Sequence, residues 1–238
     1  MSLTEAHDPT ASATTFPEHP ALLTRLSRNE VETLCLKAAR GAGMPWGLAE
    51  EAGFAAGWLA ARSIDGPAAL LAHLAARPAG GGALTISGRI WAAQDGRALC
   101  PITAGASLDD HAGLPEGVSA APVMVGALRH PVLAVPHLAR IAKAINAAIE
   151  IGWNGEKAII SADGEVDPAQ LTALSKLQEA QVVLVTCRAE HKIAPPAPDM
   201  CPLSAETLAG LNALSMRTTV PASETSRRGA GAMVSDND

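Results

Sequence analysis

Residues 27–62, SRNEVETLCLKAARGAGMPWGLAEEAGFAAGWLAAR, decide the architecture of the N-terminal part of the chain. Ser27 followed by Glu30 forms a capping box, in which the serine hydroxyl and the glutamate carboxylate each satisfy an amide of the first helical turn. Apolar residues then recur at helical spacing, and Gly41 favours the left-handed conformation that ends a helix. Pro45 is typical of a first helical position. The sequence therefore predicts two helices joined by a short turn.

The second of these helices carries a ridge of small residues. Alanine or glycine recurs every fourth position, at Ala49, Gly53, Gly57 and Ala61, so that another backbone can approach closely. The same spacing favours dimerisation in membranes, but charged residues interrupt the segment and leave it short of about 20 apolar residues. We therefore expect the ridge to pack inside a water-soluble protein. A third, short helix follows and completes a helical region over residues 21–78.

Composition excludes several classes of function. The chain has 238 residues, 48% of them hydrophobic, which is enough for a substantial core. Its formal charge is -6, with no run of lysine or arginine and few aromatic residues, which argues against binding to nucleic acid or to a membrane surface. The four cysteines are far apart and show no CxxC spacing, so that reduced thiols in the cytoplasm are expected. Residues 1–20 lack the apolar run of a signal peptide and are interpreted as a loose tail.

A glycine-rich linker at residues 78–82 separates the helical region from a second unit. Residues 83–91 alternate as a strand, and Asp95-Gly96 predicts a turn before a second strand at residues 98–103. Residues 104–121 are rich in Gly, Asp and Pro and are interpreted as a loop. This hairpin is expected either to extend the edge of a sheet or to cover its open face.

Residues 122–187 show the order strand, helix, strand, strand, helix, strand. Asn154-Gly155 predicts a tight hairpin turn between the two middle strands, and Asp167-Pro168 predicts the start of the second helix. This order is that of a ferredoxin-like split βαβ unit, in which two helices cover one face of an antiparallel sheet. We therefore predict an α+β fold with a sheet domain over residues 83–190. A connector and a helix capped by Ser204 follow over residues 191–217, and residues 218–238 form a polar, glycine-rich segment.

The run EVETLCLKAARGAGMPWGLAEEAGFAAGWLAAR, together with the ending VPASETSRRGAGAMVSDND, resembles an uncharacterised bacterial family known as domain of unknown function 3726. The likeness is expected to extend over most of the chain from Ser27 onward. It implies a bacterial and cytoplasmic protein, and a C-terminal segment that belongs to the family pattern. It implies no reaction, cofactor or catalytic residue.

Two segments contain candidate binding residues. The turn between the first two helices places Arg40, Trp46 and Glu50 near a helix N-terminus, which attracts anions through unpaired amides and the helix dipole. A plain helical turn, with a solvated helix face at Glu50 and Glu51, is the competing interpretation. In the tail, serine and arginine side chains beside glycines could bind a carboxylate or phosphate; the candidates there are Ser223, Glu224, Ser226 and Arg227.

Two other groups of residues carry reactive or ligating side chains. Asp109, Asp110 and His111 form a tight cluster, but no second cluster at ligand spacing accompanies it, so we expect neither a metal nor a cofactor. Cys187 and His191 follow a predicted strand, where a thiolate could be stabilised by adjacent cations.

These observations lead to two hypotheses of function. The first is a homo-oligomeric binding or accessory protein, assembled through the helical ridge or the open sheet face, that holds a small anionic metabolite between Arg40 and Arg227. The second is an enzyme of small-molecule catabolism, with its site at Cys187 and His191 or in the serine and arginine residues of the tail. The sequence does not decide whether the protein is an enzyme.

Overall fold

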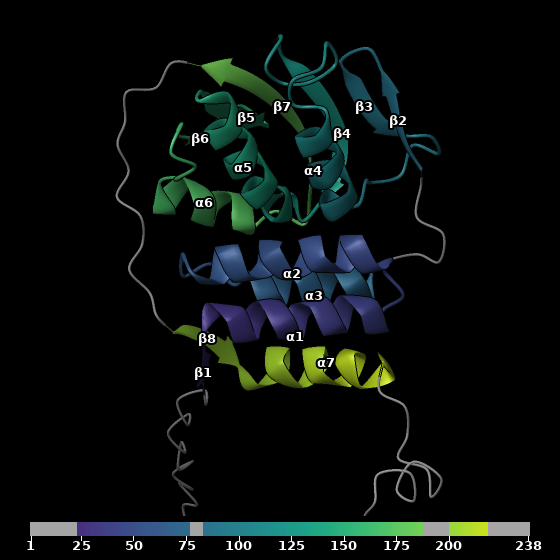
Figure 1. The fold of residues 1–238 in the computed structure, drawn as a ribbon, viewed down its shortest axis with the longest axis vertical. Coiled ribbons are helices and arrows are strands. Elements are labelled where there is room, and N and C mark those ends of the chain that lie inside the picture. The colour runs from purple at the N-terminus through teal and green to yellow at the C-terminus, as the bar shows by residue number, and fades with distance from the viewer. Residues whose placement is uncertain (1–22, 77–82, 188–199, 219–238) are drawn as a thin grey trace, which may run out of the picture.

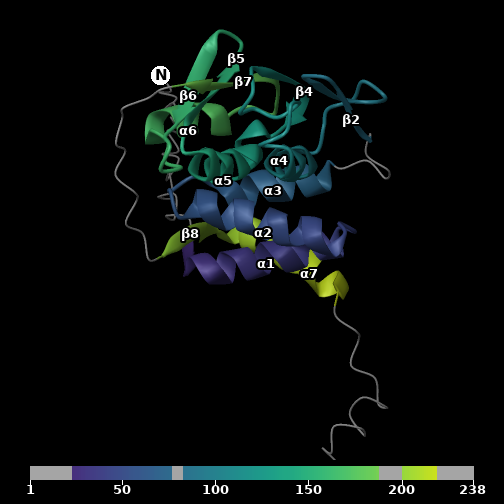
Figure 2. The same cartoon turned by 45° about the horizontal axis from the view of Figure 1, so that its top comes forward.

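The computed structural model describes residues 23–76, 83–187 and 200–218. Figure 1 shows these residues as a stack of layers, with a β-sheet at one end and helix α7 (Ala205–Ser215) at the other. Helices α4 (Pro101–Asp110), α5 (Val135–Ile145) and α6 (Pro168–Ser175) lie under the sheet. Helices α2 (Trp46–Ala60) and α3 (Gly66–Ala75) form the next layer, and α1 (Arg28–Gly41) lies between α2 and α7. The turned view in Figure 2 shows α4 and α5 side by side between the sheet and α3.

The capping signals in the helical part are confirmed. The Ser27 backbone N–H donates to Glu30 Oε2 at 2.7 Å, and the Glu30 N–H donates to Ser27 Oγ at 3.3 Å. The Asp65 carboxylate accepts from the Ala68 amide at 2.9 Å at the start of α3. These local bonds fix where the helices begin.

The small-residue ridge of α2 is covered by α1. A Cβ atom on Gly53 would lie 2.6 Å from the Glu32 carbonyl oxygen, and one on Gly57 would lie 2.2 Å from Glu32 Cγ. The α1 backbone therefore requires glycine at position 53, whereas at position 57 a methyl group would have to displace the Glu32 side chain. The prediction of packing within a folded protein is confirmed. Across the described residues, none of the helices combines the length and the apolar character that a membrane crossing needs.

The two ends of the described chain meet beside α1. Strand β1 (Leu23–Leu26) pairs antiparallel with β8 (Cys201–Ser204), and Ser204 caps α7 through a bond from the Thr207 amide at 3.1 Å. The short helix η2 (Met216–Thr218) continues α7. A Cβ atom on Gly41 would lie 1.8 Å from the Leu214 carbonyl oxygen, so the end of α7 rests directly on the end of α1.

The six-stranded sheet has the order β2-β3-β4-β7-β5-β6. Its longer strands are β4 (Val123–Arg129), β5 (Ala148–Trp153), β6 (Glu156–Ile160) and β7 (Glu179–Cys187). The predicted α+β class and the order of elements from 122 to 187 are confirmed. The turn after β5 has positive φ at Asn154 and Gly155, as a type I′ turn requires, and the Asp167 carboxylate caps α6.

The ferredoxin-like arrangement is not confirmed. A ferredoxin-like sheet would place β6 beside β4 and β7 at the edge, whereas here β7 lies between β4 and β5, and β6 is at the edge. The sheet is also mixed, because β3 (Ile90–Ala93) pairs with β4 in parallel. Alternating apolar residues show which face of a strand is buried, but they do not show which strand is its neighbour.

The prediction for residues 83–121 is wrong in two respects. Strand β2 (Leu84–Ser87) turns at Gly88, which has φ of 57°, and β3 begins at Ile90, so the hairpin lies earlier than the Asp95-Gly96 turn. Residues 101–110, predicted as the end of a strand followed by loop, form α4. Of the two predicted places for the hairpin, it takes the sheet edge, beside β4.

Candidate functional site

A cysteine lies at the junction of a strand segment and a helix. Leu99 forms a parallel bridge with Leu128 of β4, and its N–H donates to the Ala127 carbonyl at 2.7 Å. Cys100 follows as the N-cap of α4, and Pro101 takes the first helical position. The thiol is half-buried at the N-terminus of α4, which is the positive end of the helix dipole.

A histidine contacts this thiol. His73 Nε2 lies 3.3 Å from Cys100 Sγ, within hydrogen-bonding distance for sulfur. The His73 side chain is only 2% exposed, and it reaches Cys100 from the last turn of α3, so the helical layer and the sheet layer each supply one partner. A thiol beside an imidazole can transfer its proton to the ring nitrogen and become a thiolate, which is the nucleophilic form of cysteine.

A second histidine packs against the first. The ring of His130 meets the ring of His73 edge to face, with centroids 6.5 Å apart, and is 5% exposed. His130 follows β4 in the left-handed conformation, with φ of 46°, which is uncommon for a residue with a side chain. Burial, and then the charge of Arg129, lower the pKa of His130, so this ring is neutral at neutral pH.

The arrangement at Cys100 suits nucleophilic chemistry. Within the described ranges, no three His, Cys, Asp or Glu side chains converge closely enough to hold a metal ion. The thiol and the imidazole instead form the pair that activated cysteine nucleophiles use. The pair was not predicted from the sequence, because 27 residues separate its members. The available signal was a cysteine directly before proline, since Cys-Pro is compatible with a helix start.

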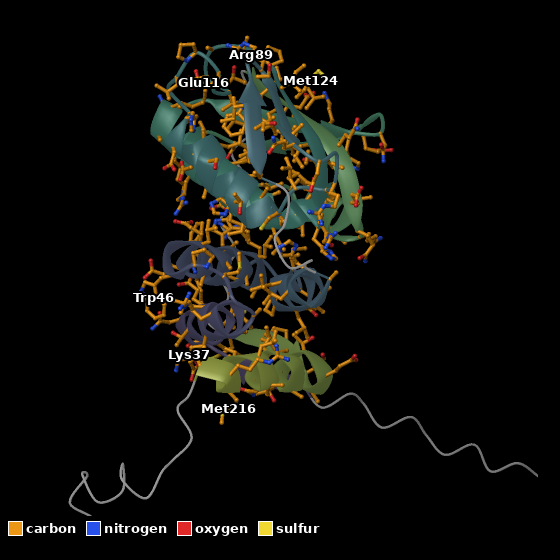
Figure 3. The ribbon with its side chains drawn as sticks, turned by 90° about the vertical axis from the view of Figure 1, so that its right-hand side faces the viewer. Lys37, Trp46, Arg89, Glu116, Met124 and Met216 are labelled. Atoms are coloured by element: carbon orange, nitrogen blue, oxygen red, sulfur yellow. The ribbon has the colours of Figure 1, made fainter. Side chains whose placement is uncertain are left out.

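The predicted residues at the turn between α1 and α2 do lie together. The guanidinium of Arg40 donates to the Met44 carbonyl oxygen and stacks over the Trp46 ring at 5.1 Å from its centroid. Trp46 is 61% exposed, and Figure 3 shows it at the side of the helical layer. Arg40 is therefore already engaged by a carbonyl and an aromatic face.

Glu50 lies beside a hollow of about 630 Å³ that is rich in carboxylates. Glu51, Asp109 and Asp110 also line it, and Arg140 is its one cationic lining residue. Such a surface repels anions, so the geometry disfavours Glu50 as part of an anion site.

An ion network in the wall of this hollow, with the buried His137 behind it, was not predicted. Arg140 donates to Glu51 Oε2 at 2.7 Å and lies 2.9 Å from Asp109 Oδ2, and its Nη2 lies 3.1 Å from His137 Nδ1. His137 is fully buried, and burial together with the charge of Arg140 lowers its pKa to about 3. Because arginine only donates, Nδ1 accepts and the proton of this neutral ring sits on Nε2, which faces Gly105. Glu50 is exposed, as a solvated face requires, whereas Glu51 is half-buried and paired with Arg140.

The Asp109, Asp110 and His111 cluster is divided among different partners. Asp109 turns to Arg140, whereas His111 Nδ1 lies 2.8 Å from the Ser107 carbonyl oxygen and its ring packs on Trp91. Burial is the largest influence on the Asp109 carboxyl and raises its pKa.

The remaining predicted residues lie outside the described part of the chain. They are the His191 ring, the side chain of Cys187, and the tail residues Ser223, Glu224, Ser226 and Arg227.

Residues 26–113 match the family model described as protein of unknown function (DUF3726), which confirms the resemblance over this range. The match includes α1 to α4, the hairpin of β2 and β3, and both His73 and Cys100, but it ends before β4. It is narrower than the expected likeness from Ser27 onward, and the description names no activity. No curated protein and no solved structure matches the chain.

Proposed function

We propose that the protein is a thiol-dependent enzyme of small-molecule metabolism, with Cys100 as its nucleophile and His73 as its general base. The separation of 3.3 Å between Cys100 Sγ and His73 Nε2 carries this proposal. The position of Cys100 at the start of a ten-residue helix supports it, because the helix dipole favours a negative thiolate.

The reaction class that suits this pair is transfer of an acyl group to water. His73 Nε2 takes the proton of the thiol, and Sγ attacks the carbonyl carbon of an ester or thioester substrate. The oxyanion would form at the N-terminus of α4, where the helix dipole favours negative charge. When the bond to the leaving group breaks, His73 returns the proton to that group. Water, deprotonated by His73, then cleaves the thioester on Cys100, which releases the acid and restores the thiol.

The proposal moves the enzyme hypothesis from Cys187 and His191 to Cys100 and His73. A bacterial cytoplasm, expected from the family resemblance and from the cysteine pattern, would keep the thiol reduced. Binding of an anionic metabolite between Arg40 and the tail is less favoured, because Arg40 is engaged and carboxylates surround Glu50. A homo-oligomeric state remains a proposal.

Thiol reactivity tests the assignment. Iodoacetamide at pH 7, followed by peptide mass spectrometry, is expected to alkylate Cys100 faster than free cysteine. Cys35 and Cys201 are internal controls, because both are buried and burial raises the pKa of each thiol. His73→Gln should slow alkylation of Cys100 and leave the melting temperature near that of the wild type.

Turnover provides the second measurement. With p-nitrophenyl acetate we expect a burst of nitrophenol equal to the enzyme concentration, lost in Cys100→Ser and reduced by roughly 10²- to 10⁴-fold in rate in His73→Gln. A Cys100 thiol that reacts no faster than free cysteine would refute the proposal, and so would a burst that survives in Cys100→Ser.

A further inference from the structure

Among the residues that the structure describes, none forms a covering layer on one of the two faces of the sheet. Helices α4, α5 and α6 cover one side, and the opposite side, here called the outer face, carries the exposed side chains of Ile90 and Met124, both 55% exposed, and of Val183, 39% exposed. Register places Ile90 beside Met124 and Met124 beside Val183, so these residues form one row across β3, β4 and β7. Large apolar side chains gathered in this way typically mark an interaction surface.

Small residues lie next to these large side chains. Ala92 and Gly126 lie beside the row, Gly152 continues it onto β5 opposite Val183, and all three line a hollow of about 600 Å³ on the outer face. Gly126 and Gly152 lie within strands, and neither has a positive φ. A Cβ on Gly126 would meet its nearest atom at 3.4 Å, and one on Gly152 at 3.8 Å, so the chain itself leaves room for a side chain at both. Glycine inside a strand weakens it and often marks a place where another molecule approaches closely.

We propose that the outer face binds the outer face of a second copy of this chain. The large row of Ile90 and Met124 lies next to a small row of Ala92 and Gly126, two residues further along the same strands. We consider a two-fold axis that lies in the interface, parallel to the sheet, runs across the strands and passes between the two rows. Rotation about this axis places the large row of each copy over the small row of the other. A surface that is complementary to itself in this way is the requirement for an isologous dimer.

The charges on the outer face are compatible with binding to an identical copy. Glu150 and Lys157 form an ion pair of 2.9 Å at the edge of the hollow, so the rim carries both signs and does not select a partner of one charge. The helical ridge, the other predicted interface, is already filled by α1.

The size of the face is sufficient for association. Strands about 4.8 Å apart and about 17 Å long give a six-stranded face of roughly 500 Å² per copy. Two copies then bury about 1,000 Å², the lower end of what a specific interface needs. This inference concerns assembly, and it stands or falls independently of the thiol chemistry.

Sedimentation velocity over a concentration series tests the dimer. The full chain is expected to sediment as a dimer at about 100 μM, a concentration at which a micromolar interface is occupied. Met124→Glu should convert it to a monomer, because the charge would be buried at the centre of the interface. Met216→Glu is the matched control: Met216 is 64% exposed and lies at the opposite end of the molecule from Met124, as Figure 3 shows, so this variant should remain dimeric.

A second variant tests the complementarity itself. Gly126→Leu adds an apolar side chain to a position where a Cβ is tolerated. The substitution would increase non-specific hydrophobic association, but it would also fill the small row and remove the shape complementarity. We expect this variant to be monomeric, with an unchanged circular dichroism spectrum. A monomeric wild type at the highest concentration would overturn the proposal, and so would a dimer that persists in both Met124→Glu and Gly126→Leu.

Discussion

The guanidinium of Arg62 donates hydrogen bonds to the carboxylate of Glu165 and thereby joins the helical layer to the sheet layer. Arg62 Nη2 lies 2.7 Å from Glu165 Oε2, and Nε lies 3.1 Å from the same oxygen. Arg62 also stacks over the Trp58 ring at 3.5 Å, and the two charged side chains are only 11% and 8% exposed. Burial is the largest influence on Arg62 and lowers its pKa, but the contacts with Glu165 oppose that effect.

Glu165→Ala is expected to destabilise the protein by about 3 to 5 kcal/mol, because it leaves the buried Arg62 charge without its partner. Urea denaturation followed by circular dichroism measures this loss. Arg28→Ala is the matched control, since the Arg28 and Glu32 pair is on the surface, 46% and 29% exposed, and should contribute less than about 1 kcal/mol. Equal effects of the two substitutions would contradict the assigned role of Arg62 and Glu165.

The buried His137 predicts acid sensitivity. Its pKa falls from 6.5 to about 3 in the folded protein, so between these values the unfolded chain binds a proton that the folded chain does not. Stability therefore rises with pH through this window: the contribution of His137 is complete above about pH 6.5 and is lost as the pH falls toward 3. At pH 4 this residue alone is expected to cost about 3 kcal/mol relative to pH 7.

His137→Gln isolates that contribution from the other titrating groups. The variant can be less stable at pH 7, but its free energy of unfolding should fall less steeply between pH 7 and pH 4 than that of the wild type. Parallel pH profiles for the two proteins would show that His137 is not the group responsible.

The contact of α1 with α7 predicts a contrast between two glycines. Gly41→Ala would place a methyl group 1.8 Å from the Leu214 carbonyl oxygen, so α7 must shift, and we expect a loss of about 2 kcal/mol or more. Gly47→Ala in the first turn of α2 meets nothing within 4 Å and should be neutral or stabilising by up to about 1 kcal/mol. Differential scanning calorimetry distinguishes the two, and a stable Gly41→Ala variant would show that α7 does not rest on this residue.

Elements with local signals could be predicted from the sequence. Ser27 with Glu30, Asp167 and Ser204 each bond to an amide within three residues, and Asn154-Gly155 needs only its own backbone freedom to form a turn. Helix α4 was missed because its glycine suggested a loop. Gly105 is there because the His137 ring, from another helix, would lie 2.3 Å from a Cβ at that position.

The strand order and the thiol site depend on contacts between distant residues. β5 lies beside β7 through the pairing of Ile151 with Leu184, and His73 meets Cys100 only after α3 and the sheet have packed. The hydrophobic periodicity of one segment shows which of its faces is buried, but it does not show which distant segment packs against that face. The sequence correctly placed Arg40 and Trp46 together at the turn, but it did not show that α4 adds Asp109 and Asp110 to the carboxylates beside Glu50.

The pairing of β1 with β8 makes the helical half discontinuous in the chain, because its first pieces are synthesised before the sheet and its last piece after it. On the ribosome, the sheet strands emerge while α1 still lacks the helix that covers Gly41. Folding units generally complete as they leave the exit tunnel. A nascent chain stalled after residue 187 should therefore expose the α7-binding side of α1, and only release of the C-terminal helix can close it.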